Sequence, residues 1–185
     1  TLKTMVITAT DTVTAELAPA ERDSYITTAD KPLCVIPDIS GRAYGTFLFD
    51  SISAAYLVNN LPTFEEPLLK GILWINMYEN VISKTVSPAD FCETAMRDLQ
   101  VITDLQLRNY LAERFTSVWW NHMTAGERSA RAAEAEAMLK GRMLSAETLS
   151  EKRSWFGTLG NVTVSRRGMD YLATLWKRGE LPGAA

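Results

Sequence analysis

Four short phrases between residues 63 and 144 constrain this chain most strongly. Each places a serine or threonine at the start of a candidate helix and an acidic or amide residue three positions later: Thr63-Phe-Glu-Glu66, Ser87-Pro-Ala-Asp90, Thr103-Asp-Leu-Gln106 and Thr124-Ala-Gly-Glu127. The hydroxyl can accept a hydrogen bond from an unpaired amide of the first turn, and the later side chain can reach back to the amide of the capping residue. The stretch therefore predicts a packed helical body.

Apolar spacing extends this expectation to six or seven helices. Within each of them apolar residues recur every three or four positions, as on the buried face of an amphipathic helix. The expected helices cover residues 44–60, 64–83, 88–102, 104–122, 125–143, 146–156 and 166–178. The third and fourth could equally form one long kinked helix, although the capping phrase at Thr103 favours a break. Gly157-Thr-Leu-Gly160 is typical of a turn and Val162-Thr-Val164 of a short strand, so the last two helices are expected to be separated by both.

The first 38 residues have a different pattern. β-branched and aromatic runs at residues 5–10, 12–14, 24–28 and 33–36 predict two to four short strands. The expected fold class is therefore mainly α (α+β), a multi-helix bundle with a small N-terminal antiparallel β segment. Residues 1–43 would form the β segment or arm, residues 44–144 the helical core and residues 145–185 a C-terminal helical subdomain resembling a helix-turn-helix, all within one compact unit.

Charge is distributed unevenly along a chain of ordinary globular composition. Residues 1–123 hold 9 Lys and Arg against 15 Asp and Glu, whereas residues 124–185 hold 10 against 7, so the C-terminal part is cationic although the whole chain carries −3. This asymmetry permits an anionic partner at the C-terminal end. No apolar run approaches the length of a membrane span, so no membrane partner is expected.

Targeting and cysteine patterns favour a cytoplasmic location. The sequence does not open with a basic segment followed by a long apolar block, as a signal peptide would. Cys34 and Cys92 lie far apart and have no metal-ligand spacing, so reduced thiols are expected.

Catalytic motifs are scarce. His122 is the one histidine, and a helical projection puts it on the same face as Leu111 and Phe115, which favours a hydrogen-bonded histidine beside the core. Nuclease D/E-x-K elements, nucleophile elbows, P-loops and dinucleotide fingerprints are absent. We therefore expect no catalytic residue, cofactor or metal, although a hydrolase or nucleotide-processing enzyme with dispersed carboxylates stays open as an alternative.

Two features of the central helices predict an interaction surface. Trp119 and Trp120 are adjacent, so their side chains diverge by about 100° on a helix and Trp120 needs a second burial site. That site could be the N-terminal sheet, the following helix or another chain, and tryptophan is a frequent interface anchor. The following helix carries small residues that let another helix approach closely. The interface candidates are Trp119, Trp120, His122, Ala130, Ala133 and Ala137.

Charged residues on the helices expected at residues 125–143 and 166–178 carry two further expectations. Glu136 and Lys140 have the spacing and orientation of a stabilising i,i+4 ion pair. Arg166 and Arg167 follow Ser165 at the start of the last helix, where two guanidinium groups could contact phosphate or a base edge. These two arginines are the nucleic-acid candidates.

The sequence as a whole favours a non-catalytic interaction protein that binds a protein partner or copies of itself. Compact acidic chains with few histidines and cysteines are typical of accessory, inhibitor or assembly subunits, including those of phages and plasmids, although this step is analogy. The alternative is a DNA-binding regulator that uses residues 145–178 as a helix-turn-helix.

Overall fold

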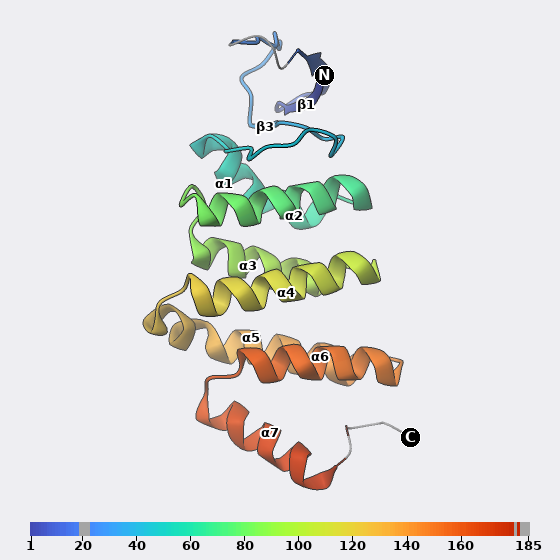
Figure 1. Ribbon diagram of the computed structural model, residues 1–185, viewed down its shortest axis with the longest axis vertical. Helices are drawn as coiled ribbons and strands as arrows, with labels where there is room; N and C mark the ends of the chain where they lie inside the picture. The colour runs from blue at the N-terminus through green and yellow to red at the C-terminus, as the bar shows by residue number, and fades with distance from the viewer. Residues whose placement is uncertain (19–22, 180, 182–185) are drawn as a thin grey trace. The chain divides into compact units, whose positions relative to one another are not determined.

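The structure, a computed structural model, describes residues 1–18, 23–179 and 181 (Figure 1). It has a small three-stranded antiparallel sheet at the N-terminus and seven α-helices among the described residues, which confirms the mainly-α (α+β) fold class. The chain forms two compact units, Thr1–Thr94 and Ala95–Ala185. The three-part division at residues 43 and 144 stays a prediction.

The sheet of the first unit is built from β1 (Leu2–Ile7), β2 (Thr12–Leu17) and β3 (Cys34–Ile36). β1 lies in the middle and pairs antiparallel with both neighbours. Val6 is buried on one face of the sheet, and Cys34 and Ile36, which pair with Ile7 and Met5, are buried on the other. Residues 24–28, which were expected to form a strand, have no regular structure.

The first helix is shorter than its apolar pattern predicts. α1 covers Ser51–Asn60, and residues 44–50 are not helical. The side chain of Asn80 explains the difference: its Oδ1 accepts from the Phe49 amide at 2.9 Å, and its Nδ2 donates to the Phe47 carbonyl at 2.8 Å. Asn80 is fully buried, so these bonds hold the segment in a non-helical conformation that the local sequence does not specify.

Asp50 caps α1 and gives the first testable prediction. Burial alone would raise the pKa of Asp50, but hydrogen bonds from the Ser53 hydroxyl and from the amides of Ser53 and Ile52 outweigh it, and the pKa lies below its usual value. A lowered folded-state pKa stabilises the fold above the unfolded-state value of about 4, and this contribution is lost as pH falls. We expect Asp50→Ala to cost about 1 kcal/mol near neutral pH in urea unfolding, and less in acid.

Glu65→Ala is the matched control for this measurement, because Glu65 is an exposed acid of the same unit. It should change the free energy of unfolding by less than about 0.5 kcal/mol. An Asp50→Ala deficit that grows as pH falls would contradict the account of the cap.

The next two helices show where capping phrases succeed and fail. α2 covers Pro67–Ile82 and is capped by Glu66, whereas Thr63 lies at the end of a short 3-10 turn, Leu61–Thr63. The expected start at residue 64 is therefore wrong, because the residue before a proline is disfavoured in helical conformation and Pro67 fixes the first turn. α3 covers Pro88–Leu99, and its expected cap is confirmed, since the Asp90 amide donates to the Ser87 hydroxyl at 3.0 Å.

The second unit contains α4 (Leu105–Asn121), α5 (Ala125–Ser145), α6 (Leu149–Val162) and α7 (Arg166–Arg178). α3 and α4 are separate helices, as expected, although α4 is capped by Asp104, one residue after the predicted threonine. Thr124 and Glu127 form the expected capping box at the start of α5. α5 and α6 form an antiparallel hairpin, and α7 follows after three residues (Figure 1). Gly179 ends α7 with φ +70°, the predicted left-handed residue.

The predicted turn at residues 157–160 and strand at residues 162–164 are both wrong. α6 continues through Gly157 and Gly160, which both lie in open space. Each glycine costs a helix interior about 1 kcal/mol. Trp155, Leu159 and Val162 recur at helical spacing on the opposite side and are all buried, and their packing outweighs the glycine cost.

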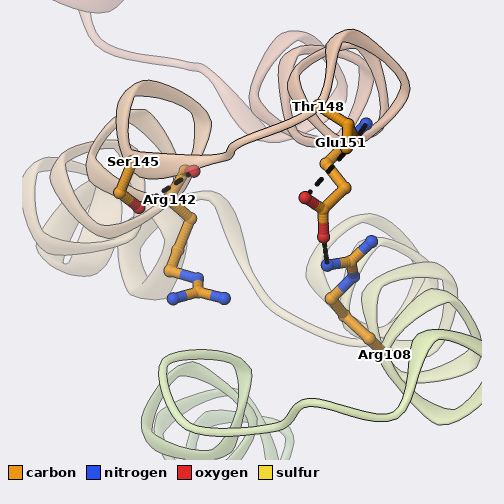
Figure 2. A network of polar contacts seen from close by, with 5 residues as sticks. All are labelled: Arg108, Arg142, Ser145, Thr148 and Glu151. Atoms are coloured by element: carbon orange, nitrogen blue, oxygen red, sulfur yellow. Dashed lines mark hydrogen bonds and ion pairs between the residues drawn. The ribbon is translucent and has the colours of Figure 1, made fainter.

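Trp155 holds three helices of the second unit together. Its ring centroid lies 5.3 Å from the guanidinium carbon of Arg108 on α4 and 5.4 Å from that of Arg142 on α5. Arg108 also forms a 2.7 Å ion pair with Glu151 in the first turn of α6, and this hydrogen bond lowers the pKa of Glu151. Figure 2 shows both guanidinium groups turned toward the same space between the helices.

Among the described residues, no helix combines the length and the apolarity that crossing a bilayer requires.

Candidate interaction groove

A groove of ≈ 540 Å³ lies where α5, the end of α6 and the start of α7 meet. We call it the α5–α7 groove. On α5, Ala133, Ala137 and Gly141 follow one another at intervals of four residues, which places them on one side of the helix. The full lining consists of Ala133, Glu136, Ala137, Lys140, Gly141, Leu144, Leu159, Ser165, Arg167, Gly168 and Tyr171.

Glu136 fixes the wall that α7 contributes. Its carboxylate accepts from the amides of Val164 and Ser165 at 3.0 and 2.8 Å and from the Ser165 hydroxyl. Ser165 in turn accepts from the amide of Gly168 at 2.9 Å and so caps α7. An acidic group at a helix N-terminus is favoured by the helix dipole, and Glu136 is 8% exposed, so it ties α7 to α5.

Close packing at Gly168 completes this junction. A Cβ atom at this position would lie 2.6 Å from Cγ2 of Thr163 and 2.8 Å from Cδ of Glu136. Both contacts are shorter than real Cβ atoms adopt, so the approach of α7 to Glu136 requires a glycine here.

The cationic side chains of the groove are Lys140 and Arg167. Nζ of Lys140 lies 3.9 Å from the ring centroid of Tyr171, a cation–π contact that joins α5 to α7. Burial raises the pKa of the Tyr171 hydroxyl, although Arg178 opposes the shift, so the ring stays neutral at physiological pH. Since the Glu136 carboxylate is hydrogen-bonded to the amides of Val164 and Ser165 just before α7, the groove presents positive charge through Lys140 and Arg167.

This geometry corrects the expected Glu136–Lys140 ion pair. The two residues have the right spacing on α5, but the Glu136 carboxylate bonds to α7 and Lys140 stacks on Tyr171. Buried backbone amides are the stronger attraction for a carboxylate, because an exposed ion pair contributes little.

The structure brings several sequence-predicted residues together in this groove and leaves others out. Ala133, Ala137 and Arg167 all line it, while Ala130 is exposed on α5 but is not part of the lining. Arg166 is exposed at the start of α7 and pairs with Asp170 at 3.3 Å. The groove therefore brings two interface candidates, Ala133 and Ala137, together with the nucleic-acid candidate Arg167. The sequence pattern predicted two separate surfaces for them.

The tryptophan and histidine candidates lie elsewhere on the second unit. Trp119 is fully buried, so its side chain is not on the surface. Trp120 is 46% exposed; its Nε1 donates to the Asn161 carbonyl at 2.6 Å, and its ring lies 4.8 Å from the Arg128 guanidinium carbon. Contacts within the second unit therefore supply part of the second burial site that the sequence predicts for Trp120.

His122 lies outside the helix from which its position was projected. α4 ends at Asn121, and His122 is the C-cap with φ −122° and ψ −27°. Its side chain is exposed rather than placed beside the core, because a helical projection no longer applies where the backbone leaves the helix.

Two kinds of reactive group can be assessed in the described residues: clusters of metal ligands and the Cys34 thiol. No set of three or more His, Cys, Asp or Glu side chains among them could hold a metal ion. Cys34 is buried, and burial raises the pKa of its thiol to about 12, so the thiolate needed for nucleophilic attack is not formed near neutral pH.

Sequence reasoning missed Glu136, Lys140, Gly168 and Tyr171 as site residues. Tyr171 had a local signal in the amphipathic pattern of the last helix, whereas the role of Glu136 depends on residues 28 and 29 positions away. Comparisons with protein-family models, curated proteins and solved structures gave no match. The class that the fold and groove define is a mainly-α chain with a small sheet and a cationic surface groove.

Proposed function

We propose that this chain is a non-catalytic interaction protein that binds an acidic amphipathic helix of a partner protein in the α5–α7 groove. The observation that carries the proposal is the combination of a small-residue floor with two cationic side chains in one groove. A cytoplasmic accessory, inhibitor or assembly subunit is the role that fits this activity.

The floor of the groove favours a helix as the bound element. Ala133, Ala137 and Gly141 have little or no side chain, so a second helix can approach the α5 backbone closely. Leu144 and Leu159 add apolar surface for the hydrophobic face of that helix. Grooves of this kind are recognised by residues at i, i+3, i+4 and i+7 of the ligand.

The charge of the groove favours acidic flanks on the bound helix. Lys140 and Arg167 face the groove, while the Glu136 carboxylate is already hydrogen-bonded to α7. Complementary charge raises association rates and selects among partners more than it adds affinity. Binding should therefore weaken as salt concentration rises.

The test compares two alanines of α5. Ala137→Trp fills the groove, whereas Ala130→Trp adds the same side chain to an exposed position outside the lining. The probe is a fluorescently labelled peptide helix with leucines on one face and glutamates on its flanks. We expect Ala137→Trp to weaken its binding at least about tenfold in fluorescence anisotropy and Ala130→Trp to leave it unchanged.

The same two variants would be used on proteins captured from the native host. A partner that the groove binds should be retained by Ala130→Trp and lost with Ala137→Trp. Equal binding of the peptide and of every captured protein by both variants would contradict the proposal. Circular dichroism spectra matching that of the unsubstituted chain establish that both variants are folded.

DNA binding is the second candidate, and the exposure of Arg166 and Arg167 at the first turn of α7 favours it. The three-residue connection between α6 and α7 also has the length found in helix-turn-helix motifs. The chain's pI of about 5.3 opposes unspecific affinity for DNA. Unchanged electrophoretic mobility of mixed-sequence DNA at low salt would eliminate this candidate.

A further inference from the structure

The outer face of α2 in the first unit carries an apolar seam. Leu68, Ile75 and Ile82 are 64%, 49% and 47% exposed, and they repeat at intervals of seven residues. A seven-residue repeat keeps side chains on one side of a helix, which is the spacing at which two helices pack along their length. Gly71 and Tyr78 lie between them at the alternate positions of the repeat. We call these five residues the α2 seam.

α7 in the second unit carries a matching surface. Met169 and Trp176 are 51% and 82% exposed and are also seven residues apart, with the half-buried Leu172 between them. We call these three residues the α7 seam. Trp176 also borders a pocket of ≈ 400 Å³ that is lined by Arg153, Phe156, Leu175, Trp176, Gly179 and Leu181. The pocket can accept an aliphatic side chain.

The two seams carry opposite charge. Glu65 and Glu66 adjoin the start of the α2 seam and Glu79 lies beside Ile75 and Ile82, whereas Lys177 and Arg178 follow Trp176. The same contrast extends to the whole units: residues 1–94 hold 6 Lys and Arg against 12 Asp and Glu, and residues 95–185 hold 13 against 10. One unit is therefore acidic and the other basic.

We propose that the α7 seam of one copy of this chain packs against the α2 seam of a second copy. Charge selects this pairing, since contact between two α2 seams would bring acidic residues together and contact between two α7 seams would bring basic residues together. The contact is heterologous, because it joins different surfaces of identical chains, and each copy of a dimer joined by one such contact keeps one unused seam. Association therefore continues beyond the dimer as concentration rises.

The test uses one blocking substitution in each seam. Ile75→Asp disables the α2 seam and Trp176→Asp disables the α7 seam, and both positions are exposed enough to accept the change without loss of the core. Sedimentation velocity of the full chain should show a mass that rises with concentration and falls with added salt. Each variant alone should lose this rise, with an association constant at least about tenfold lower.

Mixing the two variants gives the sharpest result. The α7 seam of the Ile75→Asp chain can still bind the α2 seam of the Trp176→Asp chain, so an equimolar mixture should form a 1:1 dimer and nothing larger. A mixture that stays monomeric, or single variants that still associate, would overturn the proposal. So would an unsubstituted chain whose mass is independent of concentration.

Leu105→Asp is the matched control, because Leu105 is an exposed leucine outside both seams and an acidic residue suits the first turn of a helix. It should associate like the unsubstituted chain, and loss of association in this variant would also count against the proposal. The inference does not depend on the α5–α7 groove: Ala137→Trp should leave sedimentation unchanged, so the two proposals can fail separately.

Discussion

Trp155→Ala is expected to lower the free energy of unfolding by about 3–5 kcal/mol, the largest effect of any single change considered for this chain. The indole is 2% exposed and contacts guanidinium groups from α4 and α5. Its removal leaves a cavity and also takes away the aromatic surface on which Arg108 and Arg142 stack. The free energy should be measured by urea unfolding followed by circular dichroism.

Trp176→Ala is the control for this experiment. This substitution removes a side chain of the same size from the same unit, but the Trp176 side chain is exposed on α7. At concentrations where the chain is monomeric, this change should alter the free energy of unfolding by less than about 0.5 kcal/mol. Equal effects of the two substitutions would show that Trp155 does not hold the helices together.

Glu136→Ala is expected to cost about 3 kcal/mol and to loosen α7. Three donors, the amides of Val164 and Ser165 and the Ser165 hydroxyl, lose their shared acceptor. Hydrogen–deuterium exchange should therefore accelerate in residues 163–178 more than in α4. The change should also weaken binding of the acidic helical peptide, because α7 supplies Arg167 and Tyr171 to the groove.

Glu134→Ala tests whether the effect belongs to the buried carboxylate. Glu134 is an exposed acid on the same helix, two residues away. Its removal should leave both stability and exchange within experimental error of the unsubstituted chain. Slow exchange of α7 in the Glu136→Ala variant would mean that α7 is held by its apolar contacts alone.

Local capping chemistry made much of the helical order predictable. The Ser87 and Thr124 phrases start helices where expected, because the cap and its hydrogen bonds lie within one turn. The Thr63 phrase fails, since Pro67 imposes its own helix start four residues later. A neighbouring proline thus outweighs a favourable capping pattern.

Errors in the element bounds come from interactions that are distant in the sequence. Residues 44–50 have a helical pattern, but Asn80, more than thirty positions away, holds Phe47 and Phe49 in a non-helical segment. Gly157 and Gly160 have a turn pattern, but Trp155 and Leu159 are buried against the rest of the unit, and α6 continues through both glycines. Neither the hydrogen bonds of Asn80 nor the burial of Trp155 and Leu159 can be identified from local residue spacing.

The same distinction holds for the groove. Ala133, Ala137 and Arg167 were selected from residue type and position on a helix, and they do line one surface. Their convergence depends on Glu136, whose partners Val164 and Ser165 lie in the connection between α6 and α7. The sequence pattern pairs Glu136 with Lys140 instead. The candidate residues were thus predictable, but the arrangement that unites them was not.

The most direct test of groove binding is a methyl-labelled NMR titration with the acidic helical peptide. The alanine methyl groups report on this surface because Ala133 and Ala137 lie in the groove and Ala130 on the same helix lies outside it. The proposed function predicts shifts at Ala133 and Ala137 that saturate with peptide, and little change at Ala130. Shifts confined to other alanines, or none at saturating peptide, would contradict it.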